Sequence, residues 1–477
     1  MTNQKLGLSS AISAGIGLIV ATSCLVTLSQ GVGFAGKGFI IALAIACGLN
    51  ILVSFSFAEL NGLMPVTGGL GQYTLAAMGP FVSMIAVIGG YIICGILAAS
   101  SEAAMIGFVV NSSILPNISP LLITLISILF LFIINAFGIR SYARTQMITT
   151  VIMIGSMIII GVMGALKLGS GEVVTQANQA FNPMGFGVVS MTALAFWLFI
   201  GVEFVLPLTK DMKKPEKDIP RGMILALLIL MVVQSIMIFG ISNYVPHEIL
   251  QTSNQPHMEF ARLLLGKVGT GWMTVISIGA VVSTLNTILA GIPRMLLGMA
   301  EGGMLPKVFT KTNRYGVPYN GLFLITGGIV TALLTGITSA DDLIIFILTG
   351  CLFWMASYIV AHLNVLVLRK RYPDAKRSFC VKLFGLPQIV GILGMIYMMT
   401  HIIDVPDLRN AIYSNAAILM MALVAYCFVW VKFVMKKGLF ETISMEEVIA
   451  QDENSSDLDL NNDPDYDDEK KLETVFS

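Results

Sequence analysis

The chain has 477 residues, of which 56% are hydrophobic and 12% are charged, and its basic and acidic residues balance. Soluble globular proteins carry about 25% charged residues, so this composition excludes an ordinary soluble domain. The apolar residues form continuous runs of about 20, the length with which a helix crosses a bilayer. Strands of a membrane barrel would alternate instead. The sequence therefore predicts an all-α polytopic membrane protein.

Twelve apolar runs predict twelve transmembrane helices. The first follows only Lys5 and has no small-residue cleavage site, so we interpret it as a retained span and not as a signal peptide. The predicted spans are residues 8–32, 36–61, 81–110, 120–138, 146–167, 186–208, 222–244, 270–298, 320–338, 342–368, 384–403 and 411–435.

The basic residues predict the orientation, because cytoplasmic loops are enriched in Lys and Arg. With residues 1–7 placed in the cytoplasm, five of the 28 basic residues fall outside, namely Lys37, Lys167, Arg262, Lys267 and Arg409. All the others fall inside. The asymmetry favours a cell-membrane protein with both ends in the cytoplasm.

Two further features carry less information. The six cysteines are scattered and form no C-x-x-C pair, so we interpret them as small apolar residues and expect no disulfide framework or metal site. Residues 441–477 hold thirteen acidic residues and two lysines. We expect this tail to be disordered and cytoplasmic, either as a solvated segment or as a regulatory one.

Two spans carry helix-weakening residues at their middles. The first, "AISAGIGLIVATSCLVTLSQG", contains Gly15 and Gly17 and then the small polar run 21–23, and the sixth contains Gly201 followed by Glu203. Interrupted helices at matching places in two halves indicate an inverted-repeat transporter. The repeats would be residues 8–168 and 186–368, each with five helices, followed by a pair of helices in residues 384–435.

A helix that unwinds in lipid frees backbone N–H and C=O groups, which are costly unless they line a polar cavity. Half-helix N-termini attract a carboxylate, and freed carbonyl groups attract an ammonium group or a cation. An amino acid satisfies both. The alternative for Gly17 and Gly201 is close helix packing without a break.

Four segments resemble the amino acid–polyamine–organocation (APC) superfamily of permeases. They are "SFAELNGLMPVTGGLGQY" (56–73), "FWLFIGVE" (196–203), "RMLLGMAEGGMLPKVFTKTNRYGVPYN" (294–320) and "VLRKRYPDAKRSF" (367–379). The resemblance covers about residues 6–435. It implies a leucine-transporter-type fold of five-plus-five inverted helices, with discontinuous helices 1 and 6 that bind the substrate's α-carboxylate and α-amino groups.

The resemblance also implies roles for single residues. Ala21, Thr22 and Ser23 stand where the family often has G-S-G, a departure that narrows the space for the usual substrate pose. Trp197 matches an aromatic residue that stacks on the substrate and closes the outer side of the site; a packing role is its alternative. Glu203 matches a position linked to the proton and the inner gate, and its alternative is a hydrogen-bonded strut.

Three other polar positions are candidates. Glu102, in the third span, would attract an amine, bind a proton or bond to a neighbouring helix. Ser283 and Thr284 match hydroxyl ligands of sodium-coupled relatives, with interhelical hydrogen bonding as the alternative. In the fifth span some relatives use a Lys in place of that sodium, and here the matching residue is Met153. A satisfied or water-facing role is the preferred interpretation of His362 over a proton relay.

These features predict a secondary active transporter of amino acids that works by alternating access and is driven by a proton or sodium gradient or by exchange. A transporter of polyamines or other organic amines is the alternative. An enzyme is disfavoured because no catalytic motif is visible, and a channel because mid-helix breaks indicate an occluded site. We expect a small-molecule substrate and the bilayer as partners, no nucleic acid, and no cofactor beyond Na⁺ or H⁺. The sequence does not predict an oligomeric state.

Overall fold

The computed structural model describes residues 5–66, 68–173, 181–253, 255–336, 340–403 and 405–452. Every secondary-structure element among these residues is a helix and none is a named strand, which confirms the prediction of an all-α protein. One isolated bridge joins Leu6 to Met212, so the residues before the first helix are tied to the end of the sixth predicted span.

The first half of the chain is built from α1 (Leu8–Ile19), α2 (Thr22–Ala35), η1 (Gly36–Gly38), α3 (Phe39–Leu63), α4 (Leu70–Met78), α5 (Pro80–Val87), η2 (Ile88–Ile93), α6 (Cys94–Ser113), α7 (Pro120–Ala136) and α8 (Ile139–Ala165). The second half is built from η3 (Gly185–Met191), α9 (Thr192–Phe196), η4 (Val202–Asp211), α10 (Pro215–Tyr244), α11 (His247–Thr252), α12 (Pro256–Glu301), η5 (Lys307–Thr310), α13 (Tyr319–Gly336), α14 (Ala340–Arg371), α15 (Leu386–Thr400), α16 (Pro406–Val429) and η6 (Trp430–Val434).

Each of the twelve predicted apolar runs overlaps one or more of these helices. Seven helical segments of the described chain are long and apolar enough to cross a membrane by themselves, and five more are apolar but shorter. The longest, α12, is bent at Leu265 and Gly266, close to where the predicted eighth span begins. The chain is therefore a multi-pass membrane protein, while the count of twelve crossings and the five-plus-five repeat stay predictions.

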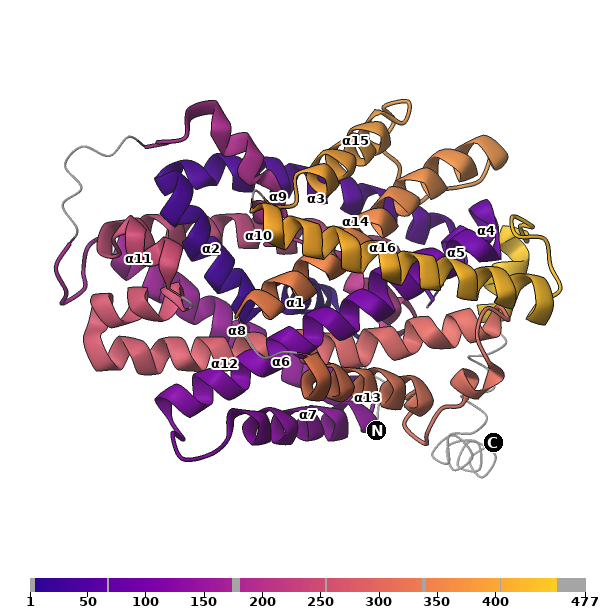
Figure 1. Cartoon of the computed structure of the whole chain (residues 1–477). Coiled ribbons are helices and arrows are strands. Elements are labelled where there is room, and N and C mark those ends of the chain that lie inside the picture. Colours follow the sequence, from indigo (N-terminus) through magenta and orange to yellow (C-terminus); the bar gives the residue numbers. More distant parts are fainter. Residues whose placement is uncertain are drawn as a thin grey trace, which may run out of the picture.

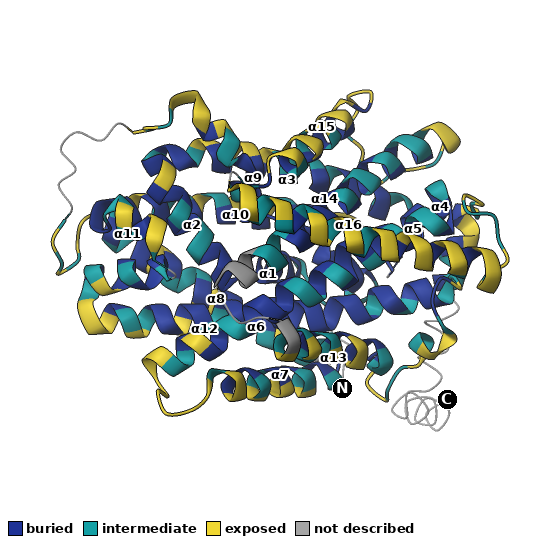
Figure 2. Ribbon diagram, viewed as in Figure 1, coloured by how far each residue is buried: buried dark blue, intermediate teal, exposed yellow. Residues whose placement is uncertain are grey.

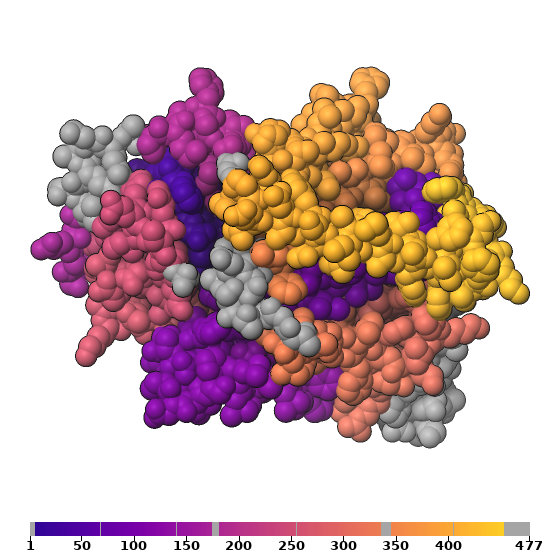
Figure 3. All heavy atoms as spheres, in the orientation of Figure 1, coloured from indigo at the N-terminus to yellow at the C-terminus, as the bar shows by residue number. Residues whose placement is uncertain are grey.

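The helix α1 lies at the centre of the molecule, and the later helices surround it (Figure 1). It packs against α8, α10, α12 and η4. Its residues Ala11, Ala14 and Ile16 are at most 2% exposed, and Figure 2 shows the buried interior around it. In Figure 3 the indigo N-terminal helices are visible only at the bottom of a furrow between the rose and gold segments. The residues that follow α1 are buried nonetheless, since Val20 is 2% and Ala21 is 3% exposed.

Large apolar side chains are exposed on the outer helices. Many of them lie on α7, α8, α15 and α16, including Phe130, Ile152, Leu393 and Met421. The exposed colour is visible on α7, α15 and α16 in Figure 2. Such a broad apolar surface is incompatible with water and suits contact with lipid tails.

The beginning of the acidic tail differs from the sequence-based expectation. Residues 445–452 form a short helix, and Val448 is 1% exposed. Asp452 makes an ion pair of 2.7 Å with Lys210 at the end of η4, and its carboxylate accepts a hydrogen bond from Gln72 in α4. Residues 441–452 are therefore part of the folded structure, and residues 453–477 lie outside the described residues.

Candidate functional site

The first break separates α1 from α2. The helix α1 ends at Ile19, Val20 and Ala21 have non-helical ψ angles of 87° and 164°, and α2 begins at Thr22. No side chain within the segment caps the new helix. The small residues at 21–23 thus lie at a true interruption, as the sequence predicts, and the N-terminus of α2 points into the protein interior.

Glu102 of α6 fills the N-terminus of α2. The backbone N–H of Thr22 donates to its Oε2 at 3.0 Å, and the N–H of Ser23 donates to its Oε1 at 3.1 Å. The carboxylate is 1% exposed. A negative charge at a helix N-terminus satisfies free N–H groups and is stabilised by the helix dipole. A protein carboxylate therefore occupies the place that sequence reasoning assigned to a substrate carboxylate.

The second break separates α9 from η4 and consists of residues 197–201. The helix α9 ends at Phe196, and Gly201 has a φ of +105°, which only glycine adopts without strain. A Cβ on Gly201 would also lie 2.4 Å from Cδ2 of Leu18. After the break the chain continues as the 3-10 helix η4, and the hydroxyl of Tyr358 accepts the N–H of Gly201 at 2.9 Å. Both predicted interruptions are thus present.

Glu203, just after the second break, is held by three side-chain donors. The hydroxyl of Tyr358 lies 2.6 Å from its carboxylate, Nε1 of Trp354 lies 2.8 Å away, and the hydroxyl of Tyr91 lies 3.2 Å away. The carboxylate is fully buried. This geometry has the form that the strut interpretation requires, because it ties η4 to η2 and α14. The link to a proton and the inner gate stays a prediction.

Trp197 joins the two breaks. Its Nε1 donates to Oγ of Ser23 at 3.1 Å, and its carbonyl oxygen accepts a weak bond from Sγ of Cys24. The indole is 6% exposed. The indole and its carbonyl group therefore connect the two breaks, and a role of Trp197 as a gate stays a prediction.

The carbonyl oxygens at the end of α1 meet hydroxyl groups of α12. Oγ of Ser283 donates to the carbonyl of Gly17 at 3.0 Å, and Oγ1 of Thr284 donates to the carbonyl of Leu18 at 3.2 Å. Carbonyl and hydroxyl oxygens are the ligand types that hard cations take. In this structure the same atoms are bonded to one another, which is the interhelical alternative.

Gln146 of α8, and not Met153, reaches this oxygen cluster. Nε2 of Gln146 donates to Oγ of Ser283 at 2.6 Å and to the carbonyl of Ser13 at 3.3 Å. A Cβ on Gly17 would lie 1.6 Å from that nitrogen, so the amide enters only because residue 17 is glycine. Met153 instead packs beside Gly279. The match of Met153 to the lysine of those relatives stays a prediction, and the amide of Gln146 is a polar contact that the sequence analysis did not consider.

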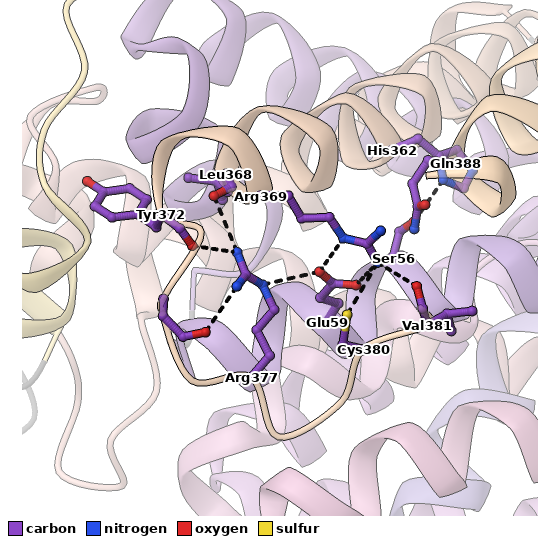
Figure 4. Close-up of polar contacts among 11 residues, drawn as sticks. Ser56, Glu59, His362, Leu368, Arg369, Tyr372, Arg377, Cys380, Val381 and Gln388 are labelled. Carbon is purple, nitrogen blue, oxygen red and sulfur yellow. Dashed lines mark hydrogen bonds and ion pairs between the residues drawn. The ribbon is translucent and has the colours of Figure 1, made fainter. Parts of the chain in front are cut away.

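The segments 56–73 and 367–379, which resemble the permease superfamily, meet in an ion-pair cluster that the sequence analysis did not predict. Glu59, 2% exposed near the end of α3, pairs with Arg369 at 2.5 Å and with Arg377 at 3.2 Å (Figure 4). Beside it, Nδ1 of His362 lies 2.8 Å from Oγ of Ser56. The cluster joins the end of α3 to the end of α14 and to the following loop. It lies apart from the two breaks.

The structure brings most of the predicted site residues into one region. The first break, the second break and Glu102 are connected through the hydrogen bonds of Thr22, Ser23 and Trp197. Ser283 and Thr284 bond to carbonyl groups in the last turn of α1, next to the first break. Glu203 lies two residues after Gly201, where the second break ends. Among the described residues, no group of three His, Cys, Asp or Glu side chains has the arrangement of a metal site.

Comparisons with known proteins show what the chain is similar to. The family described as amino acid permease matches residues 6–430. The branched-chain amino acid permease BcaP of Bacillus subtilis is 27% identical over 82% of this chain and 85% of its own length. The serine/threonine exchanger SteT of the same organism is 25% identical over 83% and 90%. A solved sodium-coupled sialic acid symporter has a similar fold, with a TM-score of 0.53 at 13% identity, over 83% of this chain and 89% of that one.

Proposed function

Because this chain belongs to the amino acid permease family, in the APC superfamily, we propose that it transports amino acids or related amines by alternating access. It is a membrane transport protein and not an enzyme. The observation that carries the proposal is the pair of helix breaks, which face each other and are joined by the hydrogen bond from Trp197 to Ser23.

The two breaks supply the chemistry that a small polar substrate needs. Backbone groups freed in an apolar surrounding are strong donors and acceptors, and they need no charged side chain to bind an ion. We assign substrate contact to the backbone at Gly17, the run 21–23 and Gly201. We assign the indole of Trp197 to stacking on the substrate, since an aromatic face attracts an ammonium group.

The membrane topology forms part of the proposal. We propose twelve crossings, with helices 1–5 and 6–10 as inverted repeats and both termini in the cytoplasm. The predominance of basic residues in the assigned inner loops supports this orientation. In this orientation Lys210 and Asp452 lie on the cytoplasmic side, together with the bridge between Leu6 and Met212.

Both sides of the site are closed in this arrangement. Glu102, Glu203 and Thr22 are at most 1% exposed, and Trp197 is 6% exposed. Transport then requires α2 and α9 to move on one side, or α1 and η4 on the other, in turn. The bridge at Leu6 links the start of α1 to the end of η4, so that these two segments move together.

A proton or sodium gradient, or exchange, supplies the energy. The oxygen cluster at Gly17, Ser283 and Thr284 has the ligand types for sodium, but the amide of Gln146 already donates to Ser283. A cation and an N–H donor compete for the same lone pairs. We therefore favour coupling without sodium.

Uptake into proteoliposomes tests the proposal. The purified full-length protein is reconstituted and given a panel of radiolabelled amino acids and amines, with proton and sodium gradients imposed separately. Saturable, concentrative uptake is the expected result. Trp197→Ala weakens the apparent affinity, whereas Trp272→Ala, at a half-buried position on α12, serves as the matched control. Flux that does not saturate would indicate a channel, and an altered product would indicate an enzyme.

A further inference from the structure

The backbone N–H groups at the first break are all engaged. The N–H of Val20 donates to Ile16, that of Ala21 donates to Ile19, and that of Cys24 donates back to Ala21. The two that remain, on Thr22 and Ser23, donate to Glu102. A substrate carboxylate would find no free donor on this segment.

A second carboxylate at the same place would also be repelled. Glu102 uses both of its oxygens on the α2 N-terminus, and an added anion would lie within a few ångströms of it in a medium of low dielectric constant. A helix N-terminus stabilises roughly half a unit of negative charge, which one carboxylate already exceeds. The position therefore holds one anion, and the protein provides it.

Glu102 has no cationic partner from the protein. Asp452, Glu259 and Glu59 are paired with basic side chains, whereas no basic side chain of the described residues pairs with Glu102. A carboxylate that is 1% exposed at membrane depth is costly when it stays charged without a counter-ion. A ligand ammonium group beside the carboxylate removes that cost, and a ligand without a carboxylate does so without bringing a second negative charge to the break.

One more buried group near α2 is left without a partner. Oγ of Ser277 in α12 is buried and has no hydrogen bond, although the carbonyl of the same residue accepts from Oγ1 of Thr22 at 3.1 Å. Ser277 is 1% exposed. Buried hydroxyls are normally hydrogen-bonded, and the contact with Thr22 places this unpaired hydroxyl's residue next to the first break, where it offers a polar group to a ligand.

We propose that the substrate is an organic amine cation without an α-carboxylate, and that Glu102 is the specificity-determining residue. This inference rests on the proposed function and narrows its substrate class. The carboxylate of Glu102 takes the place of the one that an amino acid would bring, and the ammonium group of the substrate neutralises it. Ser277 and the face of Trp197 complete the surroundings of the amine.

Matched pairs of ligands test the inference directly. Each pair consists of an amino acid and the amine with the same side chain but no carboxylate, for example leucine with 3-methylbutylamine and phenylalanine with 2-phenylethylamine. Binding to the purified full-length protein is measured by thermal shift and by competition with a labelled amine. In every pair that binds, we expect the amine to bind about tenfold more tightly or better, the effect of about one charge interaction.

Two variants assign the preference to Glu102. Glu102→Gln removes the charge and keeps the shape, and it should lower amine affinity by about tenfold. Glu102→Ala frees the N–H groups of Thr22 and Ser23 and should admit the amino acid. Ser101→Ala, on the same helix with its hydroxyl bonded only within that helix, is the matched control and should keep the wild-type preference.

The outcomes separate this inference from the proposed function. Wild-type protein that binds and accumulates the amino acid of a pair as tightly as the amine overturns the inference and leaves the transporter proposal standing. An amine preference that survives in Glu102→Gln also overturns it. No saturable uptake of either member of any pair overturns both. Since the wild-type comparison needs no variant, a misfolded Glu102 protein does not block the test.

Discussion

The two helix breaks each place a buried carboxylate at the centre of the molecule, but they bind it by different means. At the first break Glu102 comes from another helix and is held by two backbone N–H groups of α2. At the second break Glu203 belongs to the broken helix itself and is held by side chains of Tyr91, Trp354 and Tyr358. One carboxylate thus completes a backbone site, and the other anchors a broken segment to its neighbours.

The different hydrogen-bond partners indicate that Glu203 has a structural role and that Glu102 is the carboxylate that can contact a substrate. Three neutral donors from two elements surround Glu203, so its removal leaves three polar groups unpaired. Glu102 is bonded only to the start of α2, and Thr22 there also bonds to Ser277, the residue with the unpaired hydroxyl. Of the two carboxylates, Glu102 is the one whose oxygens can still accept a hydrogen bond from a ligand.

The largest effect is expected from Glu203→Ala. It leaves two hydroxyls and an indole N–H without acceptors in the interior, at a cost of about 4 kcal/mol in unfolding free energy. The thermal unfolding midpoint in detergent measures this cost. Glu203→Gln retains an acceptor and should express normally, yet lose proton-linked uptake, because an amide cannot take up a proton as a carboxylate does. Glu216→Gln, at an exposed position in the first turn of α10, is the control. Normal stability and uptake in both Glu203 variants would contradict the claim that Glu203 anchors η4 to η2 and α14.

A smaller loss of stability is expected from Glu102→Ala. Only two N–H groups at a helix N-terminus lose their acceptor, so we expect a cost of about 2 kcal/mol, clearly below that of Glu203→Ala. The same thermal unfolding measurement compares the two variants side by side. If the order were reversed, the contrast between a structural and a substrate-facing carboxylate would not hold.

Trp197→Phe tests the connection between the two breaks, because it removes the hydrogen bond that joins them. It removes the N–H that donates to Ser23 while it keeps an aromatic ring, so it should cost about 1 kcal/mol and weaken substrate binding several-fold. Titration of the purified protein with a transported ligand measures the binding. Wild-type affinity in this variant would show that the hydrogen bond between the breaks has no part in substrate binding.

The smallest expected effect concerns sodium. Because Gln146 donates to Ser283, replacing sodium by potassium on both sides of the vesicle should leave uptake unchanged. Gln146→Ala removes the competing donor and should make uptake respond to sodium. Strong sodium dependence of the wild-type protein would show that the amide turns away and that the oxygen cluster binds the ion.

The breaks themselves were predictable, because glycine and small polar residues in the middle of apolar spans are a local signal. Gly201 adopts the left-handed conformation that such a position permits, and residues 20 and 21 are non-helical as expected. The partner of Glu102 was not predictable. It depends on how α6 packs beside α2, and a single sequence contains no record of that contact.

Two other differences have similar causes. The contact of Gln146 with Ser283 was not anticipated, because it depends on how α8 packs against α12, whereas Met153 lies beside Gly279. The tail was interpreted by composition alone, yet its first residues fold because Val448 packs and Asp452 pairs with Lys210. Average composition cannot reveal a docking site that the rest of the protein supplies.

The most direct test of the central claim is a cryo-electron microscopy structure of the full-length protein in nanodiscs with a transported amine bound. We predict ligand density between the break at residues 20–21 and the break at residues 197–201, with Glu102 still bonded to the N–H groups of Thr22 and Ser23. Ligand density away from both breaks would contradict the account, as would two uninterrupted helices. A ligand carboxylate in the place of Glu102, seen with a transported amino acid, would contradict the substrate class.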